Sequence, residues 1–553
     1  MMDRADAVAA LAADEFDVVV VGGGITGAGV ALDAATRGFS VALVERHDYA
    51  SGTSSRSSKL VHGGLRYLQN FDLGLVREAL IERQIMVGLA PHLVKPLPLI
   101  VPAFGGARPD RMMGMGLNLY DVMSVDKLRS PLRRRNREPD PNEAWSPDRH
   151  RIIDAGEVAE GLPALAPREP TSGYLFYDCQ TDDSRLVLTV LGEAERFGAV
   201  CANGLEVTSL LETGGRARGV HVRDHVSGET FPVRAANVVN ATGVWADRLR
   251  PGELHDEAEV PTIRPSRGTH VTFRREDLPL NVGAIVPAGG GRFIFALPWL
   301  GGSLVGTTDT DYDATDLDHV KPADEDLEYL LEAVNEFFAT ELTQSDITGA
   351  YAGVRPLISS SEATPGKSVD ISRKAELYET SSGMVTITGG KLTTYRRMAK
   401  MAVDRLVERD ARDAPCRTHE IPLGQAIEAS ELPRVEGVHD DAYAPLAARY
   451  GHAAHDVLAI AAESGAYAQP AVPGQPDLLA EVVHAARREQ ARTVGDALLR
   501  RTRLGLTDAR GARAAAERVA GAMAGDLGWD ERAVDAAADA FLREAAAEGN
   551  VPG

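Results

Sequence analysis

A dense apolar run near the start of the chain, at residues 16–21, predicts a buried strand of a parallel sheet. A glycine-rich turn follows at residues 22–29, and residues 30–37 have the pattern of a helix that ends at Gly38. A second apolar run at residues 40–44 predicts the neighbouring strand. Together these segments predict a βαβ unit of about 30 residues.

Apolar residues at every third or fourth position, the spacing of a helix, predict helices at residues 75–89, 112–122 and 327–338. Alternating apolar and polar positions predict strands within residues 206–239, the last of them ending at Asn240, and within residues 269–308. Strands that alternate with helices are typical of an α/β fold.

The pattern changes near residue 410, beyond which Ala-rich segments with Arg and Glu predominate, such as residues 478–499 and 512–524. Such segments are typical of helices. We therefore expect an N-terminal extension over residues 1–15, an α/β part over residues 16–409 and a helical domain over residues 410–553.

Composition and charge narrow the classes of function. The chain has 553 residues, of which 44% are hydrophobic and 25% charged, as in ordinary globular proteins. The net charge of −21 repels nucleic acid and anionic lipid at long range, so we expect no nucleic-acid partner. An anionic ligand would need a local cluster of cations. The sequence contains no signal peptide and no stretch of 18 apolar residues, which favours a cytoplasmic protein without a membrane-spanning helix.

The three cysteines, Cys179, Cys201 and Cys416, lie far apart in the sequence. This spacing disfavours a disulfide framework, an iron–sulfur module or another cysteine-based metal site, and it fits a reducing compartment. We expect no metal site.

A glycine fingerprint follows the first predicted strand directly, with Gly22, Gly24 and Gly27 in the pattern G-x-G-x-x-G. Gly22 permits the tight turn, Gly24 lets the backbone approach a pyrophosphate, and Gly27 lets the helix pack on the strand. The helix N-terminus then presents N–H groups to the phosphates. Glu45 ends the second strand, where a carboxylate can accept the hydroxyls of an adenosine ribose. The combination predicts a dinucleotide site.

The choice between NAD and FAD depends on the rest of the chain. A second fingerprint for NAD(P)H is absent, whereas two further predicted strands end in glycine turns. These turns favour FAD, an elongated cofactor that can lie across several strand ends. The other residues expected to contact FAD are Arg46, Thr53, Ser54, Ser58, Lys59, Leu60, Gly63, Gly64, Ala241, Thr242, Gly243, Gly389, Gly390, Leu392 and Thr393.

Three cations in this acidic chain, Arg355, Arg373 and Lys391, lie in segments that are rich in hydrogen-bond donors. Together with a threonine hydroxyl they would suit a phosphate dianion. The alternative for any single arginine is a solvated or salt-bridged surface residue.

Several strings resemble the FAD-dependent, membrane-associated sn-glycerol-3-phosphate dehydrogenases. The most specific are Lys-Leu-Val-His-Gly-Gly-Leu-Arg-Tyr-Leu at residues 59–68 and Gly-Gly-Lys-Leu-Thr-Thr-Tyr-Arg at residues 389–396. The matches fall in order over most of residues 15–405, while the Ala-rich C-terminal part matches the family's helical cap domain in placement only. The other matching strings are residues 22–27, 54–68, 182–186, 240–243, 306–309 and 353–357.

The resemblance implies an α/β fold of the D-amino-acid-oxidase type. A Rossmann-like FAD-binding domain is interleaved with an α+β substrate-binding domain and followed by a C-terminal all-helical domain. It also implies oxidation of glycerol 3-phosphate to dihydroxyacetone phosphate by hydride transfer to FAD, with electrons passed to membrane quinone in glycerol catabolism. Such an enzyme would be held peripherally at the inner face of the cell membrane. A homodimer is an oligomeric state that stays open.

The resemblance further implies roles for individual residues. His62 and His270 are the candidates for the base that takes the C2 hydroxyl proton, because an imidazole titrates near neutral pH. Each is alternatively a structural histidine. Arg66 and Arg355 would polarise the developing ketone oxygen or hold the substrate. The residues expected to bind the substrate and its phosphate are Arg355, Arg373, Lys391, Thr307 and Tyr67.

The apolar segment at residues 112–122 runs into the most basic stretch of the chain, within residues 127–137. This pattern is typical of a surface anchor that meets anionic headgroups, and its alternative is a buried helix followed by a solvated basic loop. Three other functions also stay open: an oxygen-using glycerol-3-phosphate oxidase, an amine or amino-acid oxidase of the same fold, and a flavin-binding partner protein without turnover.

Overall fold

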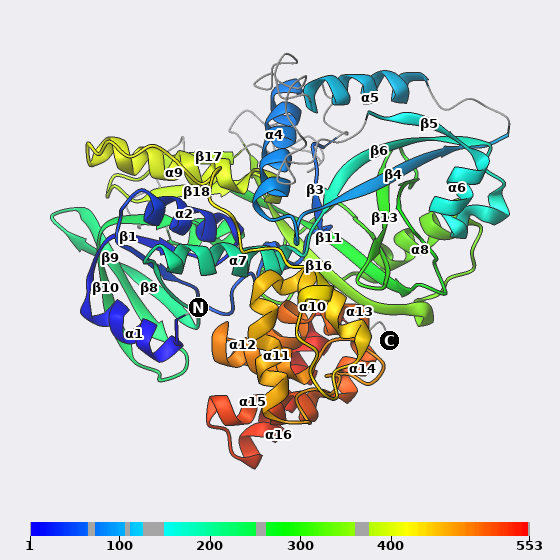
Figure 1. Cartoon of the computed structure of the whole chain (residues 1–553). Helices are drawn as coiled ribbons and strands as arrows, with labels where there is room; N and C mark the ends of the chain where they lie inside the picture. Colours follow the sequence, from blue (N-terminus) through cyan, green and yellow to red (C-terminus); the bar gives the residue numbers. More distant parts are fainter. Residues whose placement is uncertain are drawn as a thin grey trace.

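The fold is described from a computed structural model, in which the described strands form two β-sheets that lie side by side (Figure 1). The C-terminal helices within residues 443–547, called the helical part below, pack beneath both sheets in this view. Helices α4 (Leu73–Leu89) and α5 (Arg111–Ser124) lie at the opposite end. The structure describes residues 2–64, 72–105, 111–124, 149–249, 262–359 and 375–550.

The first sheet is built around β1 (Glu15–Val21), which pairs in parallel with β2 (Val41–Val44) and β10 (Thr230–Asn240). Both faces of β1 are covered, so its apolar run is continuous. Val18 and Val20 belong to a core with α2 (Ile25–Thr36), whereas Val19 and Val21 belong to a second core on the other face. The sheet also contains β7 (Val200–Ala202), β8 (Leu205–Thr213), β9 (Arg216–Asp224), β17 (Ala375–Glu379) and β18 (Val385–Gly389).

The second sheet is largely antiparallel and is made of two stretches of chain inserted into the first. One stretch lies between β2 and β7 and the other between β10 and β17, so the predicted interleaved α/β architecture is confirmed. Helix α8 (Asp324–Phe338) packs against this sheet. Its strands are β3 (Leu60–Val61), β4 (Lys95–Ala103), β5 (Arg151–Asp154), β6 (Ser172–Gln180), β11 (Thr262–Arg274), β12 (Gly283–Pro287), β13 (Phe293–Trp299), β14 (Gly302–Gly306), β15 (Thr310–Asp311) and β16 (Ile347–Ser359).

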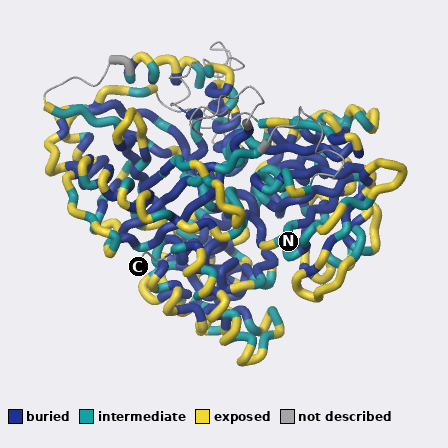
Figure 2. Tube along the Cα trace, turned by 180° about the vertical axis from the view of Figure 1, so that it is seen from behind, coloured by how far each residue is buried: buried dark blue, intermediate teal, exposed yellow. Residues whose placement is uncertain are grey.

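The C-terminal helices share a core of their own, which also takes in Trp299, Leu304 and Tyr351 of the second sheet. Seen from behind, buried chain runs without a break from the sheets into this helical part (Figure 2). The start of a separate domain at residue 410 stays a prediction. The helices are α10 (Tyr443–Tyr450), α11 (Ala454–Glu463), α12 (Leu479–Arg488), α13 (Leu504–Thr507), α14 (Ala509–Ala514), α15 (Ala516–Leu527) and α16 (Glu531–Ala547).

Two predicted elements differ from the structure, and one helix was not predicted. Helix α2 begins at Ile25, so the predicted turn over residues 22–29 is too long; Gly29 lies inside the helix, where an added Cβ would come 2.8 Å from the ring of Tyr395. The N-terminal extension contains a helix, α1 (Arg4–Ala13). The helical run expected over residues 478–499 is interrupted after α12, and the chain resumes as a π-helix at Asp496–Arg501. Within the described residues, none of the helices has the length and apolar character needed to cross a bilayer.

Candidate active site

A cavity of about 330 Å³ opens at the carboxyl ends of β1, β2, β10 and β18. This edge is where parallel α/β sheets bind their ligands. It brings together the predicted cofactor residues Gly22, Gly24, Glu45, Arg46, Thr53, Ser54, Ala241, Thr242, Gly243, Gly389, Gly390 and Leu392, together with Lys391, which was predicted to bind the substrate.

The fingerprint glycines are fixed by close backbone contacts. Gly22 has a φ of +111°, and a Cβ added there would lie 2.7 Å from the carbonyl oxygen of Ala241. A Cβ on Gly27 would lie only 1.8 Å from the carbonyl oxygen of Gly22. Gly24 is the N-cap of α2 and provides no side-chain cap, while the backbone N–H of Ile25 donates to Ser54 Oγ at 3.0 Å. A side-chain-free helix N-terminus of this kind fits a pyrophosphate.

Glu45 lines the cavity directly after β2 and is held firmly there. Its Oε2 accepts from the backbone N–H of Gly23 at 2.7 Å, and its Oε1 accepts from that of His47 at 2.8 Å. Burial raises the pKa of this carboxyl. The neighbouring Arg46 forms an ion pair with Asp318 and lies 5.5 Å from the ring centre of Trp245. The cavity residues therefore fit FAD, with a ribose acceptor beyond the glycine turn.

The remaining predicted cofactor residues are not among those that line this cavity. Thr393 follows the cavity residue Leu392, and its Oγ1 accepts from the backbone N–H of His62 at 3.1 Å. The side chain of Lys59 takes another direction, because its ammonium is buried against Asp183 at 2.8 and 2.9 Å. The predicted FAD contacts of Ser58, Lys59, Leu60, Gly63, Gly64 and Thr393 stay predictions.

The two candidate bases lie near one glycine of the second sheet. His270 of β11 pairs in register with Gly306 of β14, where an added Cβ would lie 2.3 Å from the imidazole Cδ2. Phe295 of β13 pairs with Gly306 from the other side, and its ring lies edge-on to that of His62 at 6.3 Å. Both histidines are therefore linked to Gly306, His270 directly and His62 through Phe295.

His270 is buried and held on two sides. Its Nε2 shares a hydrogen bond of 2.8 Å with Ser58 Oγ, and its ring is stacked on Tyr351 at 4.9 Å. Burial, followed by the cations of Lys59 and Arg355, lowers the pKa of His270 well below its ordinary value. The imidazole is therefore neutral at physiological pH.

Arg355 of β16 contacts the strand-end segment that follows β14. Its Nη2 donates to Thr307 Oγ1 at 3.0 Å and to the carbonyl of Thr308 at 3.1 Å, and its Nη1 donates to Asp309 Oδ1 at 3.3 Å. About a fifth of the Arg355 side chain (21%) stays exposed, so part of the guanidinium can still meet a ligand.

Arg355 and Thr307, which were both predicted to bind the phosphate, are thus hydrogen-bonded to each other, whereas the contact of Arg355 with Asp309 was not foreseen. Three other predicted site residues, Arg66, Tyr67 and Arg373, lie outside the described part of the chain.

Sequence reasoning also missed the support behind His62. Asp178 Oδ1 accepts from Arg83 Nη1 at 2.5 Å, from the Tyr120 hydroxyl at 2.6 Å and from the backbone N–H of Gly63 at 3.3 Å. This carboxylate therefore fixes the backbone next to His62. A signal was present, because Asp178 directly follows the apolar and aromatic run at residues 174–177 and a buried carboxylate requires partners.

Comparisons with known proteins cover nearly the whole chain. Residues 17–405 match the model of the FAD dependent oxidoreductase family, and residues 416–534 match the C-terminal domain of alpha-glycerophosphate oxidase. A relative named glycerol-3-phosphate dehydrogenase 2, from Mycobacterium tuberculosis, is 38% identical over 99% of this chain and 90% of its own length. The mitochondrial glycerol-3-phosphate dehydrogenase of Mus musculus is 35% identical over 94% of this chain and 71% of its own length.

A solved structure agrees with these relatives. The glycerol-3-phosphate dehydrogenase from Bacillus halodurans complexed with FAD matches with a TM-score of 0.77 and 28% identity, over 99% of this chain and 97% of that one. The expected fold and the expected FAD cofactor are therefore confirmed. The family models and the relatives together place the chain in the FAD-dependent glycerol-3-phosphate dehydrogenase family.

Proposed function

We propose that this protein oxidises sn-glycerol 3-phosphate to dihydroxyacetone phosphate and passes the electrons to membrane quinone in glycerol catabolism. The observation that supports this most strongly is that the guanidinium of Arg355 and the neutral imidazole of His270 lie on neighbouring strands of one sheet. Arg355 can bind the phosphate or the ketone oxygen, and its charge acts on His270. The names of the relatives agree with this substrate.

The residues of the chain supply binding and proton transfer. When bound, FAD supplies the acceptor for the hydride that leaves C2 of the substrate. His270, neutral and hydrogen-bonded to the Ser58 hydroxyl, is in the protonation state needed to take the C2 hydroxyl proton. His62 is the second candidate for this role. The N–H groups of Arg355 would stabilise negative charge on the oxygen or hold the phosphate together with Thr307.

The pH profile tests the role of His270. Because its folded-state pKa is lowered, His270 keeps its base form down to a pH well below 6.5, and kcat/KM should fall only in more acidic solution. The measurement is kcat/KM from about pH 4 to pH 9 for the wild type and for His270→Asn. We expect the substitution to lower activity and to remove the fall of kcat/KM in acidic solution. If kcat/KM of the variant falls in acidic solution as in the wild type, His270 is not the base.

Turnover with an artificial dye as acceptor tests the substrate. We expect dihydroxyacetone phosphate to form from sn-glycerol 3-phosphate, and glycerol, which lacks the phosphate for the Arg355 region, to be a poor substrate. Equal turnover of both compounds would contradict a phosphate site in this region.

An oxygen-using oxidase is the second candidate, because residues 416–534 match a domain named for alpha-glycerophosphate oxidase. The acceptor is tested by measuring hydrogen peroxide in air and the reduction of a short-chain quinone without oxygen. We expect quinone reduction with little peroxide. Stoichiometric peroxide without quinone reduction would make the protein an oxidase.

The membrane-facing surface is proposed at α5, at the end of the molecule opposite the helical part (Figure 1). This helix exposes Met115 (73%) and Val122 (68%), and the basic segment within residues 127–137 follows it in sequence. Apolar side chains with neighbouring cations suit the inner face of a cell membrane. The basic segment itself lies outside the described residues.

Replacing Arg133, Arg134 and Arg135 by glutamine should release the protein from the membrane fraction, because each cation near an anionic surface contributes about 1 kcal/mol. The measurement is the fraction of protein that sediments with membranes at low salt. A matched triple variant carries glutamine at Arg510, Arg513 and Arg518, which are exposed on the helical part. Equal sedimentation of both variants would show that the basic segment is not the anchor.

A further inference from the structure

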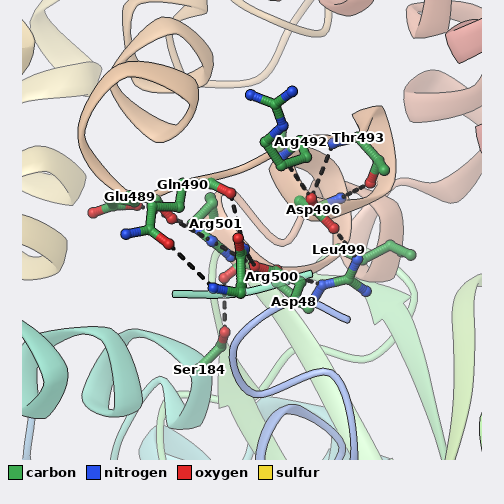
Figure 3. A network of polar contacts seen from close by, with 12 residues as sticks. Asp48, Ser184, Glu489, Gln490, Arg492, Thr493, Asp496, Leu499, Arg500 and Arg501 are labelled. Carbon is green, nitrogen blue, oxygen red and sulfur yellow. Dashed lines mark hydrogen bonds and ion pairs between the residues drawn. The ribbon is translucent and has the colours of Figure 1, made fainter. Parts of the chain in front are cut away.

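Buried arginines of the helical part form ion pairs with the part of the molecule that contains the first sheet and the cavity, called the cofactor half below. Arg500 Nε and Arg501 Nη1 both donate to Asp48 Oδ2 at 2.8 Å (Figure 3). Asp48 lies three residues beyond the cavity residue Glu45 in the sequence. The side chain of Arg503 is fully buried and reaches a different carboxylate, that of Asp183. The helical part is therefore ion-paired to the cofactor half at two separate points.

Asp183, at the start of α7 (Asp183–Arg196), connects Arg503 to the loop at residues 55–59. Its Oδ1 accepts from Arg503 Nη2 at 2.5 Å and from Lys59 Nζ at 2.9 Å. Its Oδ2 accepts from the backbone N–H of Ser57 at 3.1 Å and from Ser57 Oγ at 2.7 Å. Arg503 Nη2 also donates to the carbonyl of Ser55 at 2.9 Å. One carboxylate and one guanidinium thus hold three positions of this loop.

The loop ends in a contact with the candidate base. Ser58 lies between Ser57 and Lys59, which both contact Asp183. Its hydroxyl makes the 2.8 Å hydrogen bond to His270 Nε2. The hydroxyl of Tyr351, whose ring is stacked on His270, donates to the carbonyl of Ser57 at 2.9 Å. A shift of this loop would therefore change both contacts that orient the imidazole.

Stability alone does not explain such a cluster. Removing charges from water is expensive, and an apolar contact of similar volume often stabilises a protein as well as a buried ion pair does. Separating the partners of a buried pair is costly, however, because it leaves an uncompensated charge, so the cluster disfavours arrangements of the loop in which a charge is unpaired. Here the arrangement that the cluster fixes is the position of Ser58.

We propose that Asp183 and Arg503 are positioning residues of the oxidation site, through which the helical part fixes the loop at residues 55–59 and so orients His270. This role rests on the proposed function, because it concerns the base of that reaction. It assigns the helical part a task in the reaction beyond covering the two sheets.

The test compares Asp183→Asn, Arg503→Gln and Arg503→Lys with Arg449→Gln. Arg449 is also a buried arginine, and its partners Asp477, Glu481 and the carbonyl of Thr502 all lie within the helical part. The first measurement is amide hydrogen exchange of the peptide that contains residues 53–62, in the FAD-loaded protein. The second is the rate at which sn-glycerol 3-phosphate reduces the bound flavin without oxygen.

We expect Asp183→Asn to lose protection of this peptide and to slow flavin reduction roughly 10- to 100-fold, as small misplacements of reacting groups do. Arg503→Gln should have a smaller effect, because Lys59 still pairs with Asp183, and Arg503→Lys should restore part of the loss. Arg449→Gln should lower the melting temperature while the peptide stays protected and the reduction rate stays near that of the wild type.

Two results would overturn the proposal. One is full protection of the peptide in Asp183→Asn and Arg503→Gln. The other is lost protection with an unchanged rate of flavin reduction. If a glutamine or asparagine variant fails to fold, Arg503→Lys decides by the same two measurements. If the wild type is not reduced by sn-glycerol 3-phosphate, the proposed function fails, and hydrogen exchange alone still decides whether Arg503 and Asp183 hold the loop.

Discussion

Replacing Gly27 by alanine is expected to weaken FAD binding roughly 10- to 100-fold, and the larger valine should abolish it. The added Cβ would lie 1.8 Å from the carbonyl oxygen of Gly22, so α2 must move away from the turn that cradles the pyrophosphate. Overpacking of this kind costs about 1–3 kcal/mol or more, and every 1.4 kcal/mol is a factor of ten in affinity. The measurement is the flavin-to-protein ratio after purification, followed by titration of the apoprotein with FAD.

Gly192→Ala is the matched control. Gly192 also lies within a helix, α7, but a Cβ added there meets nothing within 4 Å. Alanine should leave FAD binding unchanged and raise the stability of this helix by about 1 kcal/mol. A normal flavin content in Gly27→Ala would show that the contact between Gly27 and Gly22 is not needed for the cofactor site.

Replacing Arg355 by glutamine is expected to lower kcat/KM for sn-glycerol 3-phosphate by roughly 10²- to 10³-fold. Loss of a single donor to a developing oxyanion has this magnitude. The change also removes the hydrogen bonds to Thr307 and Asp309, so the predicted phosphate site loses both its charge and its framework. The measurement is steady-state turnover with a dye as acceptor, together with the flavin content.

Arg264→Gln provides the comparison for this substitution. Arg264 lies on β11 and also pairs with a carboxylate, that of Asp311 at 2.9 Å, but the pair is exposed at 38% and 35%. Exposed pairs contribute little, so activity should stay within about twofold of the wild type. Similar losses in both variants would mean that Arg355 acts through the stability of the sheet rather than on the substrate.

The cofactor half could be predicted from the sequence because its signals are local. The strand at residues 16–21, the three glycines and Glu45 lie within about 30 residues, and each has one physical reason for its place. The predicted start of α2 was wrong by five residues, because the glycines at positions 27 and 29 have the composition of a turn but lie in the helix. Gly27 and Gly29 are instead helix positions where a neighbouring chain approaches closely.

The substrate half depends on contacts between distant segments, and these were only partly predictable. The resemblance indicated Arg355 and His270, but their surroundings depend on strand pairing. The antiparallel register of β11 and β16 places Tyr351 opposite His270, and the segment after β14 brings Asp309 to Arg355. Asp183 belongs to one of the family strings, but its role could not be predicted. Its partners Arg503 and Lys59 are more than 100 residues away in either direction. Spacing along the chain does not reveal such partners.

The most direct test of the account is anaerobic mixing of the FAD-loaded protein with sn-glycerol 3-phosphate. We predict that the visible absorption of the oxidised flavin is lost in proportion to added substrate, that dihydroxyacetone phosphate forms in equal amount, and that sarcosine and D-alanine leave the flavin oxidised. A flavin that stays oxidised with sn-glycerol 3-phosphate, or one that is bleached by the amines instead, would contradict the proposed function.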